Sequence, residues 1–162
     1  MNQKRWLPIL IVTLGVLSLF GSPNASAAPP NPCPLLTPAQ VSAVLGVNVG
    51  AGQNRLSTLC EWSEPGQSGP GAKKVTVTTQ DPRAFEYAKM QIGGGITKTQ
   101  VSGIGDDAVF GTTPKVAAVL TVKKGDVVFV VRVYGFPIDA GKPLEEVQAK
   151  EKALALAILS KL

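Results

Sequence analysis

The sequence predicts an α+β fold, in which an antiparallel β-sheet has helices packed on one face and the order is helix, strands, helix, strands, helix. The first observation is the segment 115–134, where two runs of β-branched apolar residues are joined at Lys124-Gly125, a pattern typical of a β-hairpin. The second is a long C-terminal segment, 143–161, whose apolar residues recur at helical spacing. The third is a pair of helix-start signals, near residues 37 and 81, each placed beside strand-like segments.

The chain begins with the features of a secretory signal peptide. Lys4 and Arg5 precede the uncharged run 6–20, and the tripeptide 25–27 reads Ala-Ser-Ala, a cleavage signal of small residues. The alternative is an uncleaved anchor, but the apolar run is shorter than the roughly 20 residues of a membrane span. We therefore expect residues 1–27 to be removed, residues 28–162 to form a single extracytoplasmic domain, and no stable membrane insertion to remain after cleavage.

The charge of the expected mature chain is mildly positive. Removing Lys4 and Arg5 leaves 14 basic residues against 11 acidic ones, a net charge of +3. The basic residues are scattered, without the block or the interleaved aromatic residues of a nucleic-acid groove. We expect the charge to serve solubility, and we expect no nucleic-acid partner.

The two cysteines, Cys33 and Cys60, are the only ones in the chain. In an exported protein a disulfide between them is the default expectation. Redox chemistry would require a C-x-x-C spacing or a neighbouring base, and neither is present.

The first half of the chain alternates helix and strand signals. Thr37 as N-cap, Pro38 at N1 and Gln40 at N3 form a capping box, and Gly46 ends the helix predicted over 38–45. The expected strands are 59–63 and 73–80, and the expected second helix is 82–91, whereas 50–57 and 64–72 read as loops.

The segment Gly103-Ile-Gly-Asp-Asp-Ala108 is the most distinctive local sequence, and it leads into a strand expected over 106–111. Asp106 and Asp107 raise the alternatives of a metal site or an acid/base pair. Neighbours on a strand point to opposite faces, and a calcium site needs about six oxygen ligands, so we expect one aspartate to cap a turn instead. The chain has no histidine. We predict no catalytic residues, no metal and no cofactor.

The central hairpin, with strands expected over 115–123 and 126–135, determines the two faces of the sheet. Folding it about Lys124-Gly125 opposes Leu120 to Phe129 and leaves one face wholly apolar, which the helix over 143–161 is suited to cover. On the mixed face, Val119 opposes Val130.

Several of these segments together resemble a known pattern. The residues Cys33-Pro-Leu-Leu-Thr37, Cys60-Glu-Trp62 and Gly103-Ile-Gly-Asp-Asp-Ala108 resemble the small bacterial secreted and lipoprotein domains of unknown function that carry C-x-L-L-T, C-x-W and G-I-G-D-x-A motifs. The resemblance implies an exported α+β domain with a disulfide between the motif cysteines, and it implies no catalytic residues. Such domains are attached to the envelope through a lipidated cysteine, which this chain lacks.

For function, the sequence favours a non-catalytic exported binding or interaction module of the bacterial cell envelope, located in the periplasm or outside the cell. The alternatives are a structural or stress-related envelope protein without a discrete ligand, or a hydrolase that works without histidine. We expect an envelope protein or a peptide as partner, bound on the mixed face by an apolar strip with Tyr134 as anchor and Arg132 at its rim, the strip being Val119, Val128 and Val130. If a short helix or the loop after Gly135 covered this strip, the site would be lost.

Overall fold

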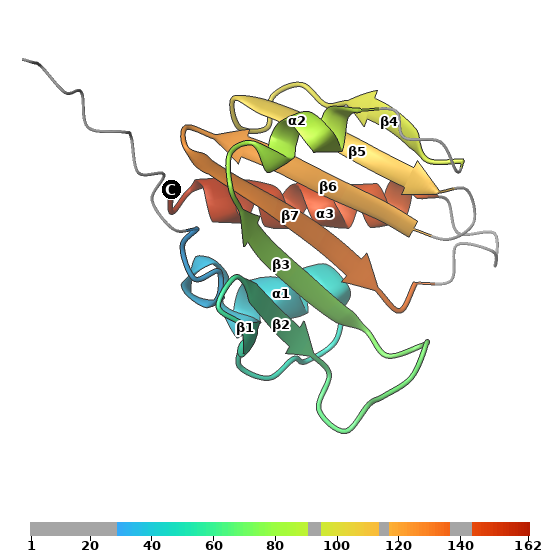
Figure 1. Ribbon diagram of the computed structural model, residues 1–162. Coiled ribbons are helices and arrows are strands. Elements are labelled where there is room, and N and C mark those ends of the chain that lie inside the picture. Colours follow the sequence, from blue (N-terminus) through green and yellow to red (C-terminus); the bar gives the residue numbers. More distant parts are fainter. Residues whose placement is uncertain (1–28, 91–94, 114–116, 137–143) are drawn as a thin grey trace, which may run out of the picture.

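A computed structural model describes residues 29–90, 95–113, 117–136 and 144–162 of the chain (Figure 1). The predicted signal peptide and its cleavage site lie outside the described residues.

The described residues form one antiparallel sheet with helices on both of its faces. The sheet has seven strands in the order β1-β2-β3-β7-β6-β5-β4, and every neighbouring pair is antiparallel. Along the chain the elements are a 3₁₀ turn η1 (Cys33–Leu35), α1 (Pro38–Leu45), β1 (Gln53–Leu56), β2 (Leu59–Ser63), β3 (Lys74–Gln80), α2 (Ala84–Lys89), β4 (Thr97–Gln100), β5 (Asp107–Thr113), β6 (Ala117–Lys124), β7 (Val127–Tyr134) and α3 (Leu144–Leu159).

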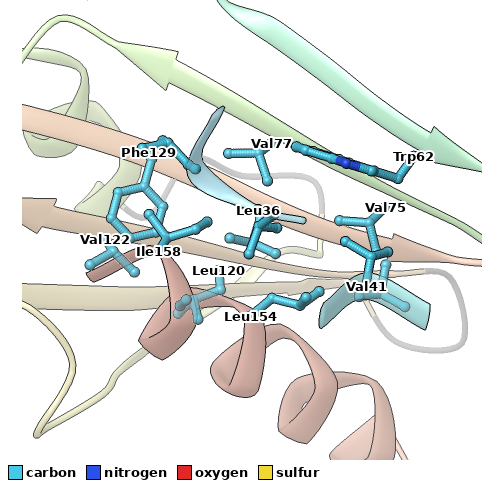
Figure 2. Close-up of a cluster of buried hydrophobic side chains, with 14 of the residues drawn as sticks. Leu36, Val41, Trp62, Val75, Val77, Leu120, Val122, Phe129, Leu154 and Ile158 are labelled. Atoms are coloured by element: carbon cyan, nitrogen blue, oxygen red, sulfur yellow. The ribbon is translucent and has the colours of Figure 1, made fainter. Parts of the chain in front are cut away.

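The main hydrophobic core lies between one face of the sheet and the helices α1 and α3. Figure 2 shows side chains of the sheet meeting those of the helices in this layer: Leu36, Val41, Trp62, Val75, Val77, Leu120, Val122, Phe129, Leu154 and Ile158. Most of them are wholly inaccessible to solvent, and each buried side chain of this kind contributes about 1.5–3 kcal/mol of transfer free energy. The α+β class, the element order and the covering of the apolar hairpin face by the C-terminal helix are confirmed.

The short helix α2 lies on the opposite face of the sheet from α3 (Figure 1). Its Phe85 is buried in a second small cluster with Val109 of β5 and Val128 of β7, and Ala88 packs beside it. Two of the three helices therefore occupy the predicted face, and α2 occupies one end of the other.

The boundaries predicted for α1 and β2 agree with the structure, and α1 begins with the predicted capping box. The Gln40 backbone N–H donates to Thr37 Oγ1 at 3.3 Å, and the Thr37 N–H donates to Gln40 Oε1 at 2.9 Å. Gly46 ends the helix with φ of +70°. The predicted loop 50–57 is wrong in part, because it contains the edge strand β1, and the opposite edge strand β4 was not predicted.

The predicted disulfide is present. Cys33 and Cys60 are bonded, with their Cα atoms 5.1 Å apart, so η1 is tied to the middle of β2.

The hairpin turn lies one residue further along the chain than predicted. Lys124 pairs with Val127, so the two turn residues are Gly125 and Asp126, and Leu120 opposes Val131 rather than Phe129. The shift changes the register by two residues, and the faces are preserved because side chains alternate with a period of two.

The reason for this register lies in the segment before β5. Asp106 Oδ2 accepts the Gly125 N–H at 2.7 Å, Asp106 Oδ1 accepts from Lys124 Nζ at 2.8 Å, and the Asp106 N–H donates to the Lys123 carbonyl at 2.9 Å. The hydrogen bond from Gly125, aided by Lys124, holds the pKa of Asp106 below its ordinary value. The expectation that one aspartate caps a turn is confirmed, and the turn is that of the neighbouring hairpin.

Gly105 brings the two segments together, which gives a first prediction. It has φ of +63°, and a Cβ at this position would lie 2.5 Å from the Lys123 carbonyl oxygen, whereas Gly103 has φ of +77° and open space around it. Gly103→Ala should cost about 1–2 kcal/mol of unfolding free energy through backbone strain alone. Gly105→Ala should cost roughly 1–3 kcal/mol more because the hairpin must move. Urea denaturation of the two variants measures the difference, and equal costs would contradict the proposed contact.

The disulfide gives a second prediction. It closes a loop with a sequence separation of 27, so replacing both cysteines by serine should lower the unfolding free energy by about 3–4 kcal/mol. Denaturant unfolding of the oxidised protein and of the double variant measures this. Alkylation of the unreduced protein is the check on the bond itself, because two reactive thiols would show that it is absent.

Candidate ligand-binding face

The face of the sheet opposite α1 and α3 is arranged in rows that cross the strands. If the β6–β7 register is continued past its last pair, Leu120 and Val131, one row runs through Lys98, Gly111, Val119, Arg132, Thr76 and Glu61, in the order β4, β5, β6, β7, β3, β2. The row nearer to α2 holds Val109, Thr121, Val130, Thr78 and Leu59. The row on the far side holds Thr113, Ala117, Tyr134 and Lys74. We call this surface the open face.

The structure divides the predicted site residues into two groups. Val128 is wholly buried and packs with Phe85 of α2, and Val130 is only 9% exposed. The prediction that these two valines belong to an exposed apolar strip is therefore wrong, and for Val128 the reason is that the short helix α2 covers it. Val119 is half-buried, and Arg132 and Tyr134 are exposed, so these three remain on the open face.

A hollow of about 890 Å³ occupies the open face. Small side chains on β5 and β6 form its floor, Ala84, Tyr87 and Ala88 of α2 border it on one side, and Ile96 lies beside it near β4. Tyr87 and Tyr134 are 65% and 36% exposed, so both rings are accessible to a ligand. A volume of this size lies within the range of small-molecule and peptide pockets.

Among the described residues, one carboxylate lines this hollow, that of Glu61, and it is already engaged by two cations. Glu61 Oε1 accepts from Arg55 Nη2 at 2.8 Å, and its other oxygen lies 3.3 Å from Lys74 Nζ. The hydrogen bond from Arg55, aided by Lys74, holds the pKa of Glu61 below its ordinary value. Lys74 also lies 5.1 Å from the centre of the Tyr134 ring. Glu61 is therefore charged and occupied, which leaves it poorly suited to act as a general base.

Two other cations on the face, Lys98 and Arg132, make no ion pair within the described part of the chain. The Lys98 side chain lies over Gly111, where an added Cβ would be 3.2 Å from Nζ. Because Gly111 has no side chain, the ammonium reaches inward across β5. Lys98 and Arg132 thus lie in one row on either side of a floor made by Gly111 and Val119.

A second hollow, of about 530 Å³, lies where β6 and β7 separate. The paired residues end at Leu120 and Val131, although both strands continue (Figure 1). Its lining includes Val133, Phe136 and Val147, and it shares Ala117, Val119, Arg132 and Tyr134 with the first hollow. We call this second hollow the notch.

Glu151 of α3 explains how the strands can separate. Continuing the hairpin register would make Ala118 and Val133 the next hydrogen-bonded pair. Instead, the Val133 N–H donates to Glu151 Oε1 at 3.2 Å. The side chain of Glu151 is wholly inaccessible, and its Oε2 has no hydrogen-bond partner among the described residues. Burial raises the pKa of Glu151 to about 8, while the Val133 hydrogen bond and the charge of Arg132 act in the opposite direction.

Over the residues that the structure describes, no group of three or more His, Cys, Asp or Glu side chains could hold a metal ion. Within the same ranges, no helix has the length and apolarity needed to cross a membrane.

Sequence reasoning did not single out Lys98, Gly111, Tyr87 or Glu151. Of these four, Glu151 alone could have been noticed from the sequence. It lies four residues after Val147 and three before Leu154, so a carboxyl group stands on the apolar side of its helix. The other three depend on contacts between strands or between a strand and a helix.

No family model matches the chain, and comparisons with curated proteins and with solved structures give no match.

Glu151 gives a third prediction, on the pH dependence of stability. Its pKa is about 8 in the folded protein against an ordinary 4.5, so between these values the folded state holds a proton that the unfolded state releases. The contribution of Glu151 to the free energy of unfolding is therefore greatest below pH 4.5. It falls as the pH rises toward 8, by at most about 1.4 kcal/mol per pH unit. Glu151→Gln keeps an acceptor for the Val133 N–H and removes the titration, so it should flatten the profile.

Thermal unfolding between pH 5 and about 8.5 measures this effect, and the absence of histidine keeps the range nearly free of other titrations. Glu145→Gln is the matched control, because Glu145 is exposed on the same helix. Parallel profiles for the wild type and Glu151→Gln would contradict the assignment.

Proposed function

We propose that this protein is a non-catalytic exported binding module of the cell envelope, and that it binds an envelope protein or peptide on the open face of its sheet. One observation carries the proposal. α1 and α3 cover one face of the sheet, whereas the other keeps a hollow of about 890 Å³ beside α2. A sheet face that is neither packed nor uniformly polar favours an interaction surface.

The composition of the face supports this proposal over the alternatives. Three of the four charged residues that line the hollow are basic, and two of these, Lys98 and Arg132, are unpaired within the described ranges. Unpaired cations beside accessible tyrosines are typical of a surface that binds an anionic partner. A structural role without a ligand does not require this arrangement. A hydrolase would require a general base that is not held in ion pairs, as Glu61 is.

Export is part of the proposal. It rests on the predicted signal peptide, on the resemblance to secreted domains, and on the Cys33–Cys60 disulfide, which persists in oxidising compartments.

A charge-reversal pair tests the binding face, as the fourth prediction. Lys98→Glu changes the open face, and Lys152→Glu makes the same change of net charge on α3, where Lys152 is exposed. We expect immobilised wild-type protein and Lys152→Glu to retain the same envelope polypeptide, identified by mass spectrometry, and Lys98→Glu to lose it.

Circular dichroism melting of all three proteins shows whether the fold is kept. Equal retention by Lys98→Glu and Lys152→Glu would reject the open face as the binding surface.

A further inference from the structure

The notch between β6 and β7 is the feature of the open face that most restricts its partner. It is lined by residues of both strands, by Phe136 and by Val147 of α3, so its inner wall is apolar. It opens onto the larger hollow through the four shared residues Ala117, Val119, Arg132 and Tyr134. A single large side chain could enter it from a ligand that lies on the face.

The notch is maintained by a contact on the core side. In a continued ladder the Val133 N–H would bond to β6, and its separation from β6 would leave a buried donor unpaired, at a cost of about 1–3 kcal/mol. The Glu151 carboxyl accepts this N–H at 3.2 Å and so removes the cost. The Val133 N–H therefore stays paired where the strands separate, and the unpaired group among the described residues is Glu151 Oε2 on the core side.

The charges around the notch favour a partner of negative charge. Arg132 lies at its rim, and Lys98 lies three strands away in the same row. At about 4.8 Å per strand spacing, and more where β6 and β7 separate, these backbone positions are at least about 14 Å apart, the length of four or more residues of an extended peptide. A second copy of this chain is disfavoured as the partner, because the face is basic and the expected mature chain carries a net charge of +3.

The notch also distinguishes a peptide from other anions. Its inner wall presents Val133, Phe136 and Val147, which match an aliphatic or aromatic side chain. A nucleic acid would place phosphates at regular intervals and would need more than two unpaired cations.

We infer that the open face binds an extended acidic peptide segment of a protein partner, with one large apolar side chain of the segment in the notch and its carboxylates on Arg132 and Lys98. This inference rests on the proposed function and specifies its partner.

The test is a selection from displayed random peptides of about nine residues, long enough to cross the face when extended. The target is the secreted, oxidised protein. We expect the enriched peptides to be net acidic and to share one large apolar residue. As the fifth prediction, Ala117→Phe should weaken their binding by about tenfold or more by filling the mouth of the notch, which corresponds to about 1.4 kcal/mol.

Two further variants make the test specific. Ala153→Phe places the same side chain on the exposed side of α3 and should leave the affinity unchanged. Arg132→Gln changes an exposed residue without adding bulk, so it tests the same site if Ala117→Phe fails to fold, and it should also weaken binding by about tenfold.

The outcomes separate this inference from the proposed function. Peptides that lose binding to Lys98→Glu but not to Ala117→Phe, or that share no apolar residue, would overturn the notch as an anchor site and leave the binding face standing. Peptides that bind every variant equally would overturn both. Failure to enrich any peptide, with binding of a single-stranded oligothymidine that Arg132→Gln abolishes, would overturn the peptide partner in favour of a nucleic acid.

Discussion

Burial of the apolar face of the β6–β7 hairpin is the constraint on which the rest of the structure depends. Leu120, Val122 and Phe129 are wholly buried beneath Leu154 and Ile158 of α3. Because side chains alternate along a strand, fixing these residues inward fixes Val119, Thr121 and Arg132 on the other face. The composition of the candidate site is thus determined by the packing of the core on the far side of the sheet.

Where local patterns agreed with tertiary packing, the sequence predicted the fold well. The capping box of α1, the alternation in β3 and the apolar stripe of α3 each carried the information for one element. The edge strands β1 and β4 were missed because their residues are almost all exposed and show no alternation of burial. The predicted hairpin turn was wrong by one residue. The hydrogen bond between Asp106 and Gly125 joins segments 19 residues apart, and the local turn preference of Lys124-Gly125 carries no information about it.

The candidate site was predicted only in part, for the same reason. Arg132, Tyr134 and Val119 follow from strand alternation, and the structure places them on the open face. Val128 is covered by Phe85 of α2. This was not predicted, because the sequence of so short a helix does not indicate which face of the sheet it covers. The separation of β6 from β7 was not predictable from the strands, since it depends on a carboxyl group contributed by α3.

α3 follows, in the sequence, the hairpin that it covers, and this order bears on how the chain folds. The sheet strands precede it in sequence, yet the cover for Leu120, Val122 and Phe129 is complete only when residues 144–159 have been made. A growing chain therefore keeps its most apolar hairpin uncovered until α3 has been synthesised. Folding of this protein is expected to be nearly all-or-none once α3 is available, and loss of α3 would leave behind a sheet face prone to aggregation.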